Sequence, residues 1–390
     1  MPVPDCADCL KAVQRASEKP HPATLAVELR KQTENKLDVL TDYYAAWPNT
    51  ILNGLRKHPH PAPVHLWIID LFAGRGWHES RKWPEGQRPG TAAAAGFRLW
   101  QAVSRTDWPF DVYAHLVAVD ADRSFEPSLH AALDRFAHPR LDVQIIPKNC
   151  ADVIGDLRRK SVGGYTLWLF DPYGLESIPF CLFEPLRWHR QTEVIVNLDA
   201  GNAQRVIDAG MKRHGTHDLN GIKSTTLDCL FGGDDWRAIP ARLTSTASRE
   251  RWLAERYRDL FPSNMERQAL PLESSSGFTR FFVQAASHRT ARDRFRKSYD
   301  DVQKIWKRHR AAPKVEDLAR QLARDLAGHE VTPAVIQSLG IFPAETTVER
   351  IRGACQHALA LGLATRCDPD GTVVLLPLAD QPNAPKGLFD

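Results

Sequence analysis

The chain alternates short apolar runs with amphipathic stretches, a pattern typical of strands that alternate with helices. Four runs rich in apolar residues occupy residues 66–69, 115–119, 142–146 and 166–170, and a fifth follows at 193–199. Such runs are expected of parallel strands that helices cover on both faces, and the first should be central. The pattern predicts an α/β fold with a mostly parallel, Rossmann-like sheet.

Two further strands are predicted near the end of this region. Residues 266–274 and 278–286 are strand-like and are separated by the short turn at 275–277. Strands joined by so short a turn form an antiparallel hairpin. A parallel sheet that ends in such a hairpin is unusual among dinucleotide-binding folds.

The α/β domain should span residues 61–310, with insertions near 77–111 and 214–250. An N-terminal tail and helical segment precede it at residues 1–60. There the apolar positions of residues 36–47 recur with helical spacing, and Pro48 should end or kink this helix. The aromatic side chains of the helix either pack into the core or form a platform for a base.

Residues 314–377 form a separate small unit. Helical patterns at 315–326, 332–339 and 347–361 are followed by two short strand-like segments around a turn. Three helices that close on a hairpin are typical of a winged-helix-like domain. Residues 378–390 are expected to be a disordered tail.

The first apolar run continues into a glycine-bearing turn. The sequence DLFAGRG follows directly, and its small residues let backbone amides approach a ligand. A dinucleotide fingerprint would have a third glycine where Glu79 stands. The alternative is a tight strand-to-helix turn without a ligand. The cofactor-binding candidates are Asp70, Phe72, Ala73, Gly74 and Gly76.

Polar residues also follow the second and third strands. Asp120 stands where an acid normally holds a ribose hydroxyl pair. Asn149 and Asp152 are candidates for contacting an adenine edge, although Asp152 fits equally well as the N-cap or first-turn acid of the next helix. Thr91, within the insertion, caps either a helix that points at the pocket or a surface helix.

The fourth strand ends in Asp171, Pro172 and Tyr173, which are the catalytic candidates. Asp171 can accept a hydrogen bond from an exocyclic amine and orient its lone pair, while Pro172 exposes a carbonyl and the aromatic ring offers a stacking face. Such chemistry needs positioning more than acid or base strength. A β-turn without catalytic function is the structural alternative.

The order DLFAGRG, then DPYG, resembles the class I S-adenosylmethionine-dependent methyltransferases, whose amino-methylating members carry DPPY or DPFG. More closely, NKLDVLTDYYAAW, IDLFAGRG, PGT and LFDPYGLESIPF resemble the three-Cys-motif partner (TcmP) family over about the first two thirds of the chain. The resemblance implies a bacterial protein with S-adenosylmethionine as cofactor. It also implies a partner, a radical-SAM-like protein that carries the three cysteines.

The tetrad departs from the amino-methyltransferase pattern at one position. Tyr173 stands where the DPPY enzymes have proline, and a one-residue shift in an extended segment turns a side chain to the other face. Cytosine C5 methyltransferases attack carbon with a cysteine from a Pro-Cys turn, and the sequence contains no such dipeptide. Cys150 and Cys181 therefore do not fit that role.

A basic stretch with aromatic residues occupies positions 288–310. It could bind the phosphates of DNA or RNA and stack bases on Phe295, Tyr299 and Trp306. Alternatively, it is a solvated amphipathic helix whose aromatic residues pack inward. The formal net charge of the 390 residues is only +4, so any nucleic-acid surface must be local.

The seven cysteines are scattered and odd in number, which predicts a reducing compartment without a disulfide framework. The pair Cys6 and Cys9 alone cannot complete a four-ligand zinc site, so it is expected to lie in a solvated tail and no metal is expected. We find no membrane-span pattern and no signal-peptide pattern, and we expect a cytoplasmic protein.

Two functions follow from these patterns. The first is S-adenosylmethionine-dependent N-methylation of an exocyclic base amine in nucleic acid. The second is a non-catalytic subunit that keeps the methyltransferase fold and serves the three-Cys-motif protein.

Overall fold

The chain divides into two compact units. The computed structural model describes residues 9–10, 31–57, 62–79, 87–186, 191–214, 224–240, 242–272, 280–310, 315–326, 328–338, 348–369 and 372–376. The first unit comprises Met1–His78 and Pro89–Val302, and the second comprises Glu79–Arg88 and Gln303–Asp390. Each unit is described by itself.

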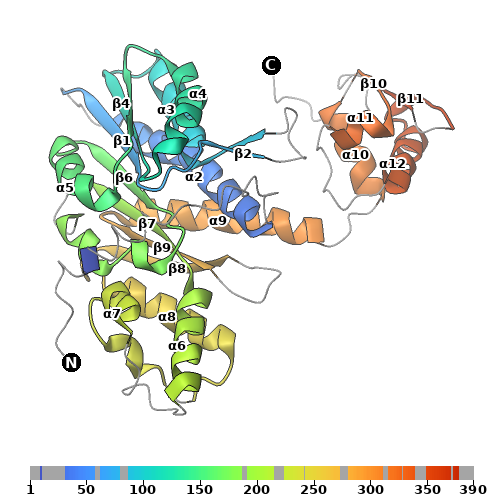
Figure 1. Ribbon diagram of the computed structural model, residues 1–390. Coiled ribbons are helices and arrows are strands. Elements are labelled where there is room, and N and C mark those ends of the chain that lie inside the picture. The colour runs from blue at the N-terminus through green and yellow to red at the C-terminus, as the bar shows by residue number, and fades with distance from the viewer. Residues whose placement is uncertain are drawn as a thin grey trace. The chain divides into compact units, whose positions relative to one another are not determined.

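A seven-stranded, Rossmann-like sheet forms the centre of the first unit (Figure 1). Its order is β5-β4-β1-β6-β7-β9-β8. The pairs β1·β4, β1·β6, β4·β5 and β6·β7 are parallel, whereas β9 is antiparallel to both β7 and β8. The strands are β1 (Val64–Asp70), β4 (Val112–Val119), β5 (Leu141–Ile146), β6 (Tyr165–Phe170), β7 (Thr192–Leu198), β8 (Glu266–Leu272) and β9 (Arg280–Ala286).

The sheet confirms the α/β prediction, including the central first strand and the antiparallel hairpin. β1 lies between β4 and β6, and both neighbours run parallel to it. Its side chains are buried on both faces except at His65, which explains the continuous apolar run. The turn predicted at 275–277 lies outside the described residues.

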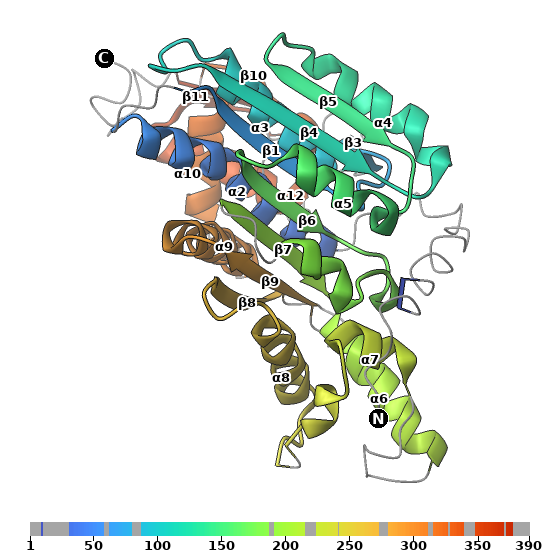
Figure 2. The same cartoon turned by 90° about the vertical axis from the view of Figure 1, so that its left-hand side faces the viewer.

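Helices cover both faces of this sheet (Figures 1 and 2). On one face pack α2 (Lys31–Leu55), α3 (Thr91–Ser104) and α9 (Arg289–Arg310), where Phe295 contacts both Tyr43 and Phe282. On the other face, α5 (Cys150–Lys160), α6 (Ala200–His214), α7 (Thr225–Phe231) and α8 (Thr246–Asp259) share a core with β1, β6 and β7.

Shorter elements lie between these helices and strands. They are the pair β2 (Trp77–Glu79) and β3 (Gln87–Pro89), helix α4 (Glu126–Leu133), and the 3-10 turns η1 (Arg123–Phe125), η2 (Asp134–Phe136), η3 (Leu175–Ser177), η4 (Phe180–Leu186) and η6 (Asp235–Ala238). The insertion predicted near 214–250 holds the short helix α7, the turn η6 and the start of α8.

Pro48 does not end its helix, so the first of the two expected effects, an end or a kink, is wrong. α2 continues seven residues beyond it, to Leu55. Asn49 Nδ2 donates to Ala45 O and Thr50 Oγ1 to Ala46 O, each at 2.8 Å. The hydrogen bond that Pro48 cannot make is the one to Tyr44 O, and these two side chains add bonds to the next two carbonyls of the same turn.

The aromatic residues of α9 pack inward. Phe295 is fully buried and Tyr299 is buried, whereas Arg289, Arg294 and Arg296 on the same helix are exposed. Of the two interpretations of this basic segment, base stacking on Phe295 and Tyr299 is therefore wrong. An exposed basic face remains.

The second unit contains three helices and a three-stranded antiparallel sheet among its described residues. Its core joins side chains of all three helices, among them Leu322, Ile336 and Ile351, to those of the strands. The helices α10 (Val315–Asp325), α11 (Pro333–Ser338) and α12 (Val348–Ala360) and the strands β11 (Ala364–Cys367) and β12 (Val373–Leu375) lie where the sequence predicted them, and β10 (Glu330–Val331) was not predicted.

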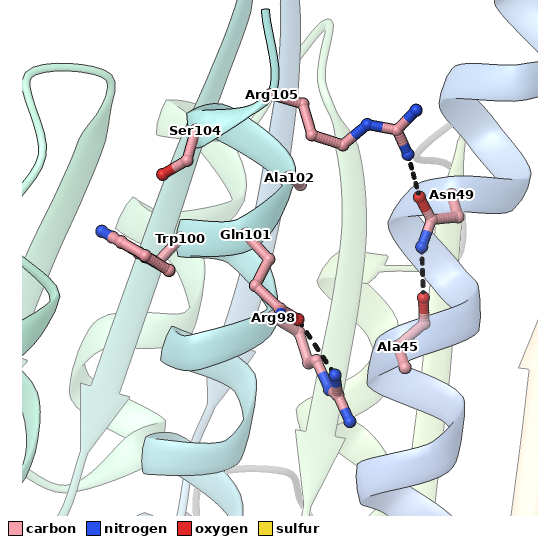
Figure 3. Close-up of a pocket in the computed structure, with 8 residues that line it drawn as sticks. All are labelled: Ala45, Asn49, Arg98, Trp100, Gln101, Ala102, Ser104 and Arg105. Atoms are coloured by element: carbon pink, nitrogen blue, oxygen red, sulfur yellow. Dashed lines mark hydrogen bonds between the residues drawn. The ribbon is translucent and has the colours of Figure 1, made fainter. Parts of the chain in front are cut away.

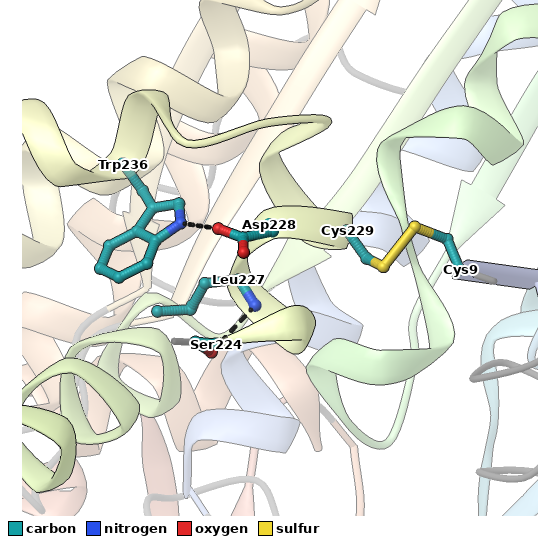
Figure 4. Close-up of a disulfide and its surroundings, with 6 residues drawn as sticks. All are labelled: Cys9, Ser224, Leu227, Asp228, Cys229 and Trp236. Carbon is teal, nitrogen blue, oxygen red and sulfur yellow. Dashed lines mark hydrogen bonds between the residues drawn. A yellow bond between two sulfur atoms is a disulfide. The ribbon is translucent and has the colours of Figure 1, made fainter. Parts of the chain in front are cut away.

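A disulfide joins Cys9 to Cys229 on α7 (Figure 4). The two cysteines are 220 positions apart, and both are buried. The expectation of a solvated tail at Cys9 is therefore wrong, and one disulfide is present where the scattered cysteines predicted no disulfide framework. Spacing along the sequence does not reveal this pair because the partner of Cys9 lies in the insertion. The helix that carries Cys229 is capped by Ser224, whose Oγ accepts from Leu227 N at 3.3 Å. Cys6 lies outside the described residues.

Among the described helices, none has both the length and the apolar character that crossing a bilayer requires.

Candidate functional site

The predicted site residues lie where parallel strands end. Asp70 closes β1, and its partner across the ladder is Leu169 of β6, two residues before Asp171. Asp120 directly follows Val119, the last residue of β4. Because neighbouring parallel strands end at one edge, the sheet brings these three carboxylates to the same side.

Asp70 supports the glycine turn from inside. Its side chain is completely buried, Thr91 Oγ1 donates to Oδ2, and Phe72 N donates to Oδ1 at 3.1 Å. Burial raises the pKa of Asp70 to about 7, against the lowering effect of these two hydrogen bonds. The expectation that Thr91 caps its helix is wrong. Gly90 is the N-cap residue, and the threonine hydroxyl binds Asp70 instead.

The two glycines of the turn have different roles. Both have positive φ, +60° at Gly74 and +75° at Gly76. A Cβ at Gly74 would have no atom within 4 Å, whereas one at Gly76 would lie 2.8 Å from Ala132 Cβ on α4. Gly76 is therefore required by packing, and Gly74 leaves open space beside the turn.

Asp120 holds the same turn from the β4 side. Its Oδ2 accepts from Gly74 N at 2.8 Å and its Oδ1 from Asp122 N at 2.9 Å. The side chain is half-buried, unlike that of Asp70. Phe72 is also half-buried, and Ala73 N donates to Val119 O at 2.9 Å, which fixes the turn against β4.

Asn149 and Asp152 lie at the start of α5. Asn149 is the N-cap and accepts from Ala151 N at 2.9 Å, while Asp152 is the exposed acid of the first turn. The first-turn alternative thus describes the position of Asp152. Between them, burial raises the pKa of the Cys150 thiol to about 12, so it stays protonated and is no nucleophile.

Asp171 is held by two side chains from distant elements. Lys36 Nζ on α2 binds Oδ2, and Asn197 Nδ2 on β7 donates to Oδ1 at 2.7 Å. Burial alone would raise the pKa of Asp171, but the ammonium of Lys36 and the hydrogen bonds from Lys36 and Asn197 bring it below its ordinary value. Asp171 is therefore an ionised acceptor of hydrogen bonds.

Two buried polar atoms next to Asp171 have no hydrogen-bond partner among the described residues, Tyr44 Oη and Asn197 Oδ1. Burial and the negative charges of Asp70 and Asp171 raise the pKa of Tyr44, so the phenol lies within electrostatic reach of both carboxyls. Buried polar atoms without partners are rare and often mark a place for water or ligand. Asn197 Oδ1 belongs to the same side chain that donates to Asp171 through Nδ2.

The next two residues of the tetrad, Pro172 and Tyr173, differ in solvent exposure. Pro172 is buried, whereas the side chain of Tyr173 is 68% exposed. A ring so exposed is available to a flat partner from solution.

Sequence reasoning missed Lys36, Tyr44 and Asn197. A signal existed for each: Lys36 and Tyr44 fall on the buried stripe of α2, together with Leu40, and Asn197 is a polar residue that follows three apolar residues in the buried strand β7. Buried polar residues at such positions need a partner, and the sequence does not show where that partner is.

The pocket in Figure 3 is a different feature. It has a volume of about 410 Å³ and lies between α2 and the C-terminal half of α3, whereas the other end of α3 carries Thr91. Arg98 donates to Gln101, and Arg105 donates to Asn49 and Asp107, whereas Arg98 Nε and Ser104 Oγ are buried without a hydrogen-bond partner among the described residues. The pocket contains none of the predicted site residues, and we place the candidate site at the strand ends instead.

No protein-family model matches the chain, and no curated protein matches it. One similar solved structure is described as "Crystal structure of cofactor-bound Rv0187 from MTB". The identity is 13%, the aligned region covers 72% of this chain and 89% of that chain, and the TM-score is 0.27.

Proposed function

We propose that the first unit is a class I methyltransferase that transfers a methyl group from S-adenosylmethionine to an exocyclic amine of a nucleic-acid base. The observation that carries the proposal is the meeting of the Gly74 turn with Asp171 at one sheet edge. The order of the strands, with the antiparallel β9 between β7 and β8, supports it, since the resemblance implies a parallel sheet that ends in such a hairpin.

The residues of the turn suit a nucleoside cofactor. The open space at Gly74 would receive it, and Asp120 would face the ribose hydroxyls, while Asp70 and Gly76 hold the turn without contacting it. Asn149 and Asp152 would line the adenine side from the start of α5. Bound S-adenosylmethionine supplies a methyl group on a sulfonium, which is a good leaving group.

Asp171 would orient the acceptor. Its carboxylate accepts an N–H bond, so the amine lone pair points toward the methyl donor. The lone pair forms the new N–C bond as the C–S bond breaks, sulfur retains the bond's electron pair, and the amine releases a proton to solvent. Tyr173 would stack on the base from its exposed position, and Pro172 keeps the tetrad anchored in the core.

Calorimetric titration with S-adenosylmethionine tests the site. We expect micromolar binding by the wild type, and loss of that binding in Gly74→Val and in Asp120→Ala. Asp171→Ala should keep cofactor binding and lose methyl transfer to nucleic acid. Absence of binding by the folded wild type would refute the proposal.

A specific observation favours a second candidate, the non-catalytic partner subunit of a three-Cys-motif protein. Both oxygens of Asp171 are already engaged, by Lys36 and Asn197, as in a structural ion pair. Copurification of the two proteins, with no methyl transfer by this chain, would support this candidate.

The nucleic-acid substrate would be bound by local basic surface. The exposed arginines of α9 provide one such surface, and the second unit, with the helix and strand content of a winged helix, is another candidate. The function of the second unit does not follow from its fold alone.

A further inference from the structure

An amine already lies on Asp171. Lys36 Nζ binds Oδ2, and the side chains of Lys36 and Asp171 are only 9% and 12% exposed. The negative charge of Asp171 is thus balanced before any substrate arrives.

We propose that Lys36 is the specificity-determining residue of the acceptor site, whose ammonium neutralises Asp171 so that the site takes an uncharged aromatic amine and rejects a protonated alkylamine. The proposal rests on the proposed function. It assigns to α2 a part in substrate selection.

The ammonium of Lys36 would repel a positively charged acceptor. Two cations about 4 Å apart repel by about 4 kcal/mol at the effective dielectric constant of a protein surface, and burial increases this. An alkylammonium acceptor would meet Lys36 on the same carboxylate. An exocyclic aromatic amine is uncharged at neutral pH and meets no such repulsion.

A protonated alkylamine would also have to lose a proton before it could accept a methyl group. An alkylammonium has no lone pair until a base removes its proton, and an efficient base has a pKa near the working pH. The pKa of Asp171 lies below its ordinary value, because Lys36 and Asn197 outweigh the effect of burial. Asp171 is therefore suited to orient an amine and not to deprotonate one.

Two buried oxygen atoms could accept a hydrogen bond from the acceptor amine. Asn197 Oδ1 and Tyr44 Oη are buried without partners among the described residues. An aromatic amine has two N–H donors, and an oxygen beside Asp171 can accept the one that the carboxylate does not. An unfilled acceptor next to an occupied carboxylate suits this geometry.

Ligand affinities test Lys36 without requiring turnover. The probes are S-adenosylhomocysteine, which is uncharged at sulfur, and sinefungin, which carries an ammonium group in place of the methylsulfonium. In Lys36→Met the freed carboxylate should attract that ammonium, so the ratio of sinefungin affinity to S-adenosylhomocysteine affinity should rise about tenfold. Lys36→Arg should leave the ratio within about twofold of wild type, and so should Lys57→Met, which changes an exposed lysine two residues after the end of α2.

The double variant Lys36→Met/Asp171→Asn removes both charges and avoids a lone buried carboxylate, so it guards against misfolding of the single variant. In the double variant, the roughly tenfold rise in the ratio of sinefungin affinity to S-adenosylhomocysteine affinity should disappear. If folded Lys36→Met has the same affinity ratio as the wild type, the proposed role of Lys36 is overturned and the proposed function is unaffected. Absence of binding of either probe to the wild type would overturn the proposed function as well. Methylation of Lys36 itself by added S-adenosylmethionine, seen by peptide mass spectrometry, would show that an alkylamine is accepted and would also overturn the inference.

Discussion

Tyr43 donates its hydroxyl hydrogen to Glu193, whose two carboxylate oxygens lie 2.7 and 2.8 Å from Tyr43 Oη. The contact ties α2 to the start of β7, 150 positions later in the chain. Gln284 Nε2 on β9 donates to the same carboxylate, and all three side chains are buried. The helix that carries Lys36 is thus fixed to the sheet by a network at its middle.

Glu193 should make stability depend on pH. Burial raises its pKa from 4.5 to about 7, more than the hydrogen bonds from Tyr43 and Gln284 lower it. Between these values the folded protein keeps a proton that the unfolded chain has lost, so stability should fall as pH rises from about 4.5 to 7. In Glu193→Gln, the fall in the free energy of unfolding between about pH 4.5 and 7, measured by urea denaturation, should be smaller by on the order of 3 kcal/mol. The exposed Glu184→Gln is the control, and an unchanged slope in Glu193→Gln would contradict the assignment.

Thr91 should stabilise the glycine turn through Asp70. Thr91→Val keeps the shape of the side chain but leaves Asp70 Oδ2 without its donor, so we expect a loss of about 1 to 3 kcal/mol in the free energy of unfolding. Thr91→Ser keeps the hydroxyl and should lose markedly less. Equal losses in the two variants would show that methyl packing matters, not the hydrogen bond.

Alanine should be tolerated differently at the two glycines. Gly74→Ala meets no neighbour and should cost about 1 kcal/mol for its positive φ. Gly76→Ala adds a Cβ 2.8 Å from Ala132 Cβ and should cost at least about 2 kcal/mol more. Denaturation midpoints measure both, and the reverse ranking would refute the packing role of Gly76.

The disulfide should be visible by mass spectrometry. A non-reduced digest is expected to contain the Cys9 peptide linked to the Cys229 peptide. Cys229→Ser should lower the free energy of unfolding by about 2 to 4 kcal/mol, and Cys181→Ser, which removes a free thiol, should lower it less. Detection of only free Cys9 and Cys229 in the unreduced protein would contradict the bond.

The exposed face of α9 should contribute to nucleic-acid binding by charge alone. Arg294→Glu together with Arg296→Glu should weaken binding, and the slope of log affinity against log salt concentration should become shallower by about one for each phosphate that is no longer neutralised. Lys57→Glu, on exposed surface elsewhere, is the matched control. An unchanged salt dependence would exclude this face.

The fold was largely predictable because its strands carry continuous apolar runs, and because the segments that form β8 and β9 are strand-like and follow one another closely in the sequence. The candidate residues that follow strands were predictable for the same reason, since the strand position fixes the edge on which they lie. Lys36 and Asn197 were not, because their meeting with Asp171 depends on how α2 packs across the sheet and on strand order. The continuation of α2 beyond Pro48 could not be predicted, since a proline either ends or kinks a helix. The disulfide of Cys9 could not be predicted because its partner lies 220 positions away.

The position of β9 between β7 and β8 sets an order of assembly. β8 pairs only with β9 among the described strands, so residues 266–272 have no place in the sheet until residues 280–286 have been synthesised. A chain that stops between them would expose the edge of β7 and the apolar face of β8, both prone to pairing with other chains. The last two strands must therefore join the sheet together, as one hairpin.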